Sequence, residues 1–134
     1  MGTVKNGFLL DTHTLLWAVQ EEKKLGRGAR KVIENPDSLL YVSAISAFEI
    51  ACKYRIGTLP GYSHVVENYQ DILQRFGAND LSVCLAHARF AAHFEWQHRD
   101  PFDRILAAQA SLENLTLISN DAVFATLPWL SVLW

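Results

Sequence analysis

The chain has 134 residues, of which 50% are hydrophobic and 19% are charged, and its net charge is −2. At this length folding hides roughly 68% of the extended chain's surface, so a single domain can build a core without disulfides. The chain shows no signal peptide and no apolar run of the ~20 residues that a membrane span needs. We therefore expect a cytoplasmic protein without a membrane partner, in which Cys52 and Cys84 are buried free thiols.

Residues 1–7 carry no pattern, and we expect them to be disordered or left over from cloning. Beyond them the pattern predicts, in chain order, a strand at 8–10, helices at 12–20 and 25–34, a strand at 39–42, helices at 44–56 and 65–76, a strand at 81–83, helices at 85–94 and 101–113, a strand at 115–118, a short helix at 121–127 and a strand at 131–133. Continuously apolar strands that alternate with helices are typical of a parallel sheet covered on both faces. The prediction is one domain over 1–134, a three-layer α/β/α fold with a mostly parallel central sheet.

Two acids follow predicted strands. Asp11 comes directly after 8–10, and Asp121 comes three residues beyond Ile118. In a parallel sheet both would lie at one edge, where open α/β sheets bind ligands. Each acid also precedes a predicted helix, so a helix-capping role explains either one alone.

Glu49 stands within a helix whose apolar stripe is expected to be buried, at positions 45, 48, 49, 52 and 56. A buried carboxylate without a partner is costly and would take up a proton. A structural salt bridge is one explanation, and a metal-binding or catalytic role is the one that the sequence favours.

The stretch Asp100-Pro101-Phe102-Asp103 resembles a helix start, with Asp100 as the cap and proline in the first turn. Asp103 shares its helix face with apolar residues of the predicted core, whereas Asp100 can point to water. We therefore expect Asp103 to bind the ligand and Asp100 to cap the helix or support Asp103.

Four acids thus converge in the prediction: Asp11, Glu49, Asp103 and Asp121. Two carboxylates ~4 Å apart repel by about 4 kcal/mol at an effective dielectric constant of 20, so such a group needs a cation. Oxygen ligands without cysteine or clustered histidine favour Mg²⁺ or Mn²⁺. An ion of this kind can activate water against a phosphodiester. The four acids are therefore predicted to be both metal ligands and catalytic residues of a nuclease.

Other side chains near the acids have supporting roles in this prediction. Arg99 and Arg104 flank the third acid and are expected to bind RNA phosphates, although Arg104 also fits an ordinary helix surface. The histidines at 87, 93 and 98 are too poorly spaced for a metal on one helix, and we expect them at the surface. Four polar residues are expected to orient the ligands: Thr12, Ser43, Asp100 and Asn120.

Four stretches resemble the PIN domain, and in particular its VapC-type toxin branch: Leu9 to Trp17, Val42 to Lys53, His98 to Ala110 and Leu115 to Asp121. The His-Arg-Asp-Pro-Phe-Asp-Arg sequence is highly specific, whereas Asp-Thr-His alone is not. The similarity runs from about Phe8 to Trp134. It departs from the family at Phe48, where relatives usually have tryptophan, and at Asn120, where they often have arginine.

The resemblance implies a Rossmann-like parallel sheet and a Mg²⁺ or Mn²⁺ site formed by Asp11, Glu49, Asp103 and Asp121. It also implies an endoribonuclease that is the toxin of a toxin–antitoxin pair, a homodimer, and a small cognate antitoxin that covers the groove. Two other functions stay open at this point. One is a non-enzymatic PIN-like subunit that binds RNA or regulates, and the other is a structure-specific DNA nuclease.

Overall fold

The computed structural model describes residues 7–134. Five strands form one sheet in the order β3-β2-β1-β4-β5, and every neighbouring pair is parallel. The predicted mostly parallel central sheet is therefore confirmed. The strands are β1 (Gly7–Leu10), β2 (Leu39–Ser43), β3 (Ala78–Leu81), β4 (Thr116–Ile118) and β5 (Val132–Leu133).

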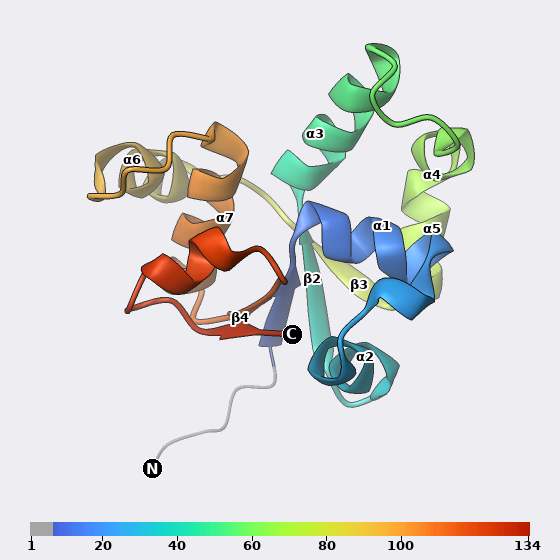
Figure 1. Cartoon of the computed structure of the whole chain (residues 1–134), viewed down its shortest axis with the longest axis horizontal. Coiled ribbons are helices and arrows are strands. Elements are labelled where there is room, and N and C mark those ends of the chain that lie inside the picture. The colour runs from blue at the N-terminus through green and yellow to red at the C-terminus, as the bar shows by residue number, and fades with distance from the viewer. Residues whose placement is uncertain (1–6) are drawn as a thin grey trace.

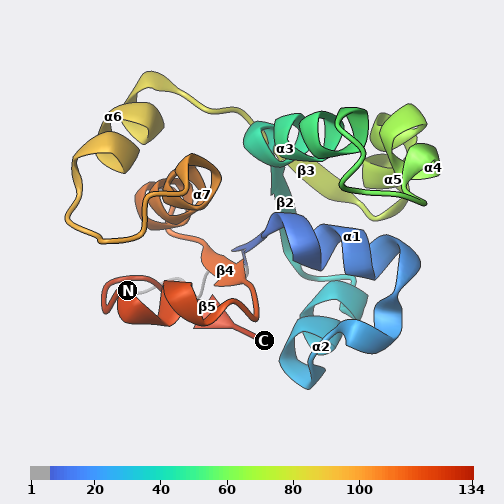
Figure 2. The same ribbon diagram turned by 45° about the horizontal axis from the view of Figure 1, so that its top comes forward.

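Helices cover both faces of the sheet, which gives the predicted three-layer α/β/α fold. Figures 1 and 2 show α6 and α7 together on one side of the sheet and α1, α2, α4 and α5 on the other. The α-helices are α1 (Thr12–Gln20), α2 (Arg27–Glu34), α3 (Ala44–Arg55), α4 (Ser63–Glu67), α5 (Tyr69–Arg75), α6 (Leu85–His93) and α7 (Pro101–Leu112), and the 3-10 helices are η1 (Glu22–Lys24) and η2 (Ala122–Thr126). Across residues 7–134, no helix is both long enough and apolar enough to cross a bilayer.

The central strands are buried on both faces. Successive side chains of a strand point to opposite sides of the sheet. Leu9 and Leu117 accordingly pack in the cluster that includes α7 and η2, whereas Leu10 and Ile118 pack in the cluster that includes α1 and α5. This double burial explains the consecutive apolar residues at the ends of β1 and β4, and the parallel pairing of the two strands places their carboxyl ends at one edge.

Several predicted element boundaries are wrong by one or two residues, and three further differences concern α4 and α5, β3 and Gly7. The helix expected at 65–76 is two helices that meet at Asn68, whose side-chain amide donates to the carbonyl of His64 and ends α4. The strand expected at 81–83 is β3, which lies earlier because it pairs with Leu40–Ser43. β3 is a polar edge strand, so it lacks the apolar run that marks the others. Gly7, expected in a disordered segment, begins β1, while residues 1–6 of that segment lie outside the described residues.

The two cysteines are free thiols, as predicted, but they are not buried. Cys84 is exposed just before α6, and Cys52 is half-buried on α3. The position of Cys52 follows from how α3 faces the core. The buried residues of α3 are Ser46, Glu49 and Ile50, and Ile45 packs against the core, whereas Phe48 and Ile56 of the predicted stripe are exposed.

Candidate metal centre

Asp11 ends β1 and begins α1. Its Oδ1 accepts a hydrogen bond from the backbone N–H of Thr14 at 2.7 Å, and its own N–H donates to the carbonyl of Ile118 at the end of β4. The residue is only 6% exposed. Burial raises the pKa of its carboxyl group, and hydrogen bonds from Ser119 and Thr14 together with the charge of His13 offset only part of this effect. Within residues 7–134, no lysine or arginine forms an ion pair with Asp11.

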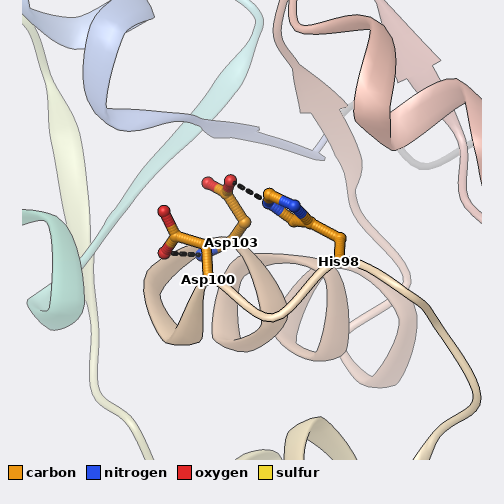
Figure 3. A group of neighbouring side chains, drawn as sticks. All are labelled: His98, Asp100 and Asp103. Carbon is orange, nitrogen blue, oxygen red and sulfur yellow. Dashed lines mark hydrogen bonds and ion pairs between the residues drawn. The ribbon is translucent and has the colours of Figure 1, made fainter.

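A second acid group lies at the start of α7 (Figure 3). Asp100 caps this helix as predicted, since its Oδ1 accepts from the N–H groups of Phe102 and Asp103 at 2.8 and 3.3 Å. Nε2 of His98 lies 2.7 Å from Oδ2 of Asp103. His98, Asp100 and Asp103 each offer one potential ligand atom, and these atoms lie within 4.8 Å of one another.

Burial and neighbouring negative charges both raise the pKa of the Asp103 carboxyl group. Burial is the largest cause that raises its pKa, to about 6, and the negative charges of Asp100 and Asp121 raise it further. The hydrogen bond from His98 acts in the opposite direction. A bound cation at this position would relieve both the desolvation and the repulsion.

Asp121 contributes its charge from the loop after β4. Its Oδ1 accepts from the N–H of Val123 and caps η2, so the capping role considered from the sequence is present. Asp121 and the neighbouring Asn120 are both exposed. Because the charge of Asp121 acts on Asp103, the two lie on the same side of the molecule.

Glu49 is buried but already has a cation. Its Oε2 lies 2.6 Å from Nζ of Lys53, one helical turn further on, and its Oε1 accepts from the hydroxyl of Thr12 at 2.7 Å. The salt bridge considered from the sequence is therefore present. Thr12 follows Asp11, so this hydrogen bond joins α3 to the end of β1.

The predicted stripe of α3 is wrong in its orientation, although Glu49 itself is buried. Phe48 and Ile56 are 58% and 64% exposed, and Phe48 packs loosely against Phe102 of α7. The helix turns its polar side inward because Glu49 is bonded to Thr12, and Thr12 also lies 3.0 Å from the hydroxyl of Ser46.

The four predicted acids therefore do not form a single compact group of ligand atoms. Within the described range, the group of three or more potential ligands contains His98, Asp100 and Asp103 but not Asp11, Glu49 or Asp121. Ser43 caps α3 by accepting from the N–H of Ile45 at 3.0 Å, at the end of the strand beside β1.

Three expectations about basic residues are wrong, and the first two concern Arg104 and His87. Arg104 is half-buried, and its guanidinium donates to four backbone carbonyls, so it is not free to bind phosphates. His87 is only 2% exposed and pairs with Glu113 at 2.8 Å. Arg99 and His93 are exposed, as expected for each.

His98 was expected at the surface but is half-buried against Asp103. The sequence signal for it was its position two residues before the cap Asp100. A side chain there can fold back over the first turn of the helix, whereas the spacing between histidines gave no indication of this.

The model of the PIN domain family matches residues 8–130. The chain belongs to the PIN domain family. The family resemblance predicted from the sequence motifs is therefore confirmed. The comparison with curated protein sequences gives no match.

Several solved structures have the same PIN fold. A toxin–antitoxin complex from Klebsiella pneumoniae is 21% identical, covers 94% of this chain and 95% of its own, and has a TM-score of 0.66. FitAcB from Neisseria gonorrhoeae is 21% identical, with coverages of 95% and 96% and a TM-score of 0.65. DNA-bound VapBC from Salmonella typhimurium is 17% identical, with both coverages 98% and a TM-score of 0.66. At these low sequence identities, the similarity to the solved structures establishes a shared fold and nothing more.

The donor set of this PIN domain fits a divalent cation. Asp11 is a buried carboxylate with no lysine or arginine ion pair within residues 7–134, and Asp103 lies beside two further negative charges. Carboxylate oxygens are the ligands that Mg²⁺ and Mn²⁺ prefer. Glu49 fits less well, because Lys53 already neutralises it.

Proposed function

We propose that this PIN domain is a Mg²⁺- or Mn²⁺-dependent endoribonuclease and the toxin of a toxin–antitoxin pair. The observation that carries the proposal is the carboxylate of Asp11, buried at a strand end and without a cation in the part of the chain that the structure describes. A carboxylate held in this state is costly unless a ligand compensates its charge. The ion, when bound, supplies positive charge that stabilises the phosphodiester oxygens during hydrolysis.

In this proposal each acid has its own task. Asp11 and Asp103 hold the ion, and Asp121 adds negative charge from the loop after β4. Asp103 uses the oxygen that points away from His98, since Oδ2 is bonded to the imidazole (Figure 3). Glu49 joins as a ligand when Lys53, whose side chain is 39% exposed, moves into solvent. Asn120 and Ser43 flank the ligands, and exposed Arg99 contacts RNA.

The proposed partners are a small antitoxin and a second copy of this chain. One of the structural relatives described above is a toxin–antitoxin complex, which supports an antitoxin partner. An exposed apolar flank on α3, which includes Phe48 and Ile56, supplies surface that a protein partner can cover. Both cysteines are free thiols, which supports the proposed cytoplasmic location.

One observation favours a second function. Because Lys53 neutralises Glu49, this part of the site is stable without a metal. A non-enzymatic PIN-like subunit that binds RNA or regulates would need no more than this. The uncompensated charge of Asp11 favours the metal-dependent enzyme over this alternative.

The test uses purified protein without antitoxin and a structured RNA, with Mg²⁺, Mn²⁺ or EDTA. We expect cleavage with either ion, none in EDTA, and none with Asp11→Asn. Asp37→Asn, an exposed acid at the opposite edge of the sheet, is the matched control and should cleave as the wild type does.

Cleavage that persists in EDTA or survives Asp11→Asn would refute the proposal. DNA of the same sequence, tested beside the RNA, separates a ribonuclease from a structure-specific DNA nuclease. Mn²⁺ binding without cleavage of either substrate would favour the non-enzymatic alternative.

A further inference from the structure

Arg104 stands in the first turn of α7, one residue after Asp103, yet its side chain points back across the preceding loop. Nε donates to the carbonyl of Ala91 at 2.7 Å, and Nη1 donates to those of Trp96 and His98 at 3.2 and 2.9 Å. Nη2 donates to the carbonyl of Phe94. The guanidinium thus binds the end of α6 and the loop that connects α6 to α7.

This arrangement uses properties that only arginine has. A guanidinium offers five N–H donors in a fixed planar fork, whereas lysine offers a single compact ammonium group. The carbonyls of Ala91 and Phe94 belong to the end of α6, where helix carbonyls lack partners and attract positive charge. The guanidinium carbon also lies 4.3 Å from the centre of the Phe94 ring, a cation–π contact.

The clamped loop is the segment that carries His98. Trp96 stacks on Phe94, with ring centres 5.5 Å apart, and the His98 ring meets Trp96 edge-on at 4.8 Å. The imidazole then reaches Oδ2 of Asp103. A continuous series of contacts therefore leads from Arg104 through the loop to the carboxylate of Asp103.

We propose that Arg104 is a positioning residue for the metal centre: it fixes the loop at 94–98, and the loop holds His98 against Asp103. His98 occupies one oxygen of Asp103 and so directs the other toward the ion. The step that concerns the ion rests on the proposed function, whereas the positioning of His98 does not. Arg104 acts through His98 in this proposal and touches neither the ion nor the RNA.

The first test uses the protein without metal and measures the imidazole ¹⁵N and ¹³C signals of His98 by NMR. Arg104→Lys should shift these signals toward those of a freely averaging imidazole, as Asp103→Asn also should. Arg89→Lys, an exposed arginine of α6, is the matched control and should leave them unchanged. Far-UV circular dichroism shows whether each variant is folded. Unchanged His98 signals in folded Arg104→Lys would overturn the positioning role.

The second test measures Mn²⁺ affinity by calorimetry. Groups that orient metal ligands typically change affinity 10- to 100-fold, so we expect His98→Leu and Arg104→Lys each to weaken binding about tenfold. His98→Gln keeps an N–H donor at a similar reach and should restore affinity to within about threefold. A merely structural role for His98 would not give this rescue.

The double variant Arg104→Lys, His98→Leu decides whether the two residues act in series. If Arg104 acts through His98, the double variant binds Mn²⁺ about as weakly as His98→Leu alone. Independent effects that multiply to about 100-fold would overturn the proposal. If the wild type binds no Mn²⁺, the proposed function fails, and the His98 signals still decide whether Arg104 positions the imidazole.

Discussion

Asp11 and Glu49 are two buried carboxylates with opposite surroundings. Each is 6% exposed, and the two are joined through Thr12. Glu49 has a lysine 2.6 Å away, whereas Asp11 has hydroxyl and backbone donors and a weaker charge contribution from His13. Equal burial therefore leaves one negative charge compensated and the other not.

The difference teaches that burial alone does not identify a metal ligand. A buried acid with its own cation can be an ordinary structural ion pair. A buried acid without one, whose pKa is raised by desolvation, needs a ligand or a proton. By this criterion Asp11 and Asp103 are the strongest ligand candidates, and Glu49 depends on whether Lys53 moves.

The largest expected effect is a loss of ribonuclease activity, which should be greater when Asp11 is replaced than when Glu49 is replaced. Asp11→Asn should lower ribonuclease activity by at least about 100-fold, the usual scale for removal of a key electrostatic group, while Glu49→Gln should lower it by only about tenfold. Initial rates on one RNA, with Asp37→Asn as the control, measure both. Equal losses in the two variants would contradict the distinction.

The second effect concerns Asp103 in the metal-free protein. Its folded-state pKa of about 6 lies above its ordinary value of 3.8, so the carboxyl group ionises first in the unfolded chain as the pH rises. The contribution of Asp103 to the free energy of unfolding is therefore fully present below pH 3.8 and is lost as the pH rises through about 6. Asp103→Asn removes this penalty and should stabilise the metal-free protein at pH 7 by on the order of 1–3 kcal/mol.

Urea unfolding at pH 3.5 and pH 7, in the presence of EDTA, measures this difference. We expect the variant and the wild type to differ at pH 7 and to converge at the lower pH. A destabilised Asp103→Asn at pH 7 would mean that the bond from His98 outweighs desolvation and repulsion.

The third effect tests whether Glu49 can exchange its partner. Lys53→Met leaves Glu49 buried without a cation, which should destabilise the metal-free protein by about 1–2 kcal/mol. The same change frees Glu49 and should strengthen Mn²⁺ binding severalfold. Lys31→Met, an exposed lysine of α2, is the control. Weaker Mn²⁺ binding in Lys53→Met would show that Glu49 is not a ligand.

The smallest effect is expected at Asp121, which is exposed and caps a short helix. Asparagine caps a helix about as well as aspartate, so Asp121→Asn should change thermal stability by less than about 0.5 kcal/mol. Mn²⁺ affinity should fall only a few-fold, because the charge acts on Asp103 through space. A loss as large as that of Asp11→Asn would make Asp121 an equal ligand.

Much of the fold could be predicted from the sequence because its signals are local. The apolar runs of β1 and β4 mark strands buried on both faces, and the Asp100-Pro101 pair marks the start of α7. The bounds of β3 could not be predicted, since a polar edge strand is specified by its partner β2 rather than by its own pattern.

The site was harder to predict, because its side chains choose partners across the fold. Lys53 lies four residues after Glu49, a spacing that suits an ion pair on one helix, but the salt bridge was considered without a named partner. Arg104 looked like a surface base because nothing local shows that four carbonyls of the preceding loop surround it. The partnership of His98 with Asp103 depends on that loop and was missed for the same reason.

The most direct test of the metal centre is a calorimetric titration of metal-free protein with Mn²⁺, for the wild type, Asp11→Asn and Asp37→Asn. We predict binding by the wild type, unchanged binding by Asp37→Asn, and affinity at least about tenfold weaker in Asp11→Asn. No Mn²⁺ binding by the wild type, or equal affinity in Asp11→Asn, would contradict a metal site built on the buried carboxylate at the end of β1.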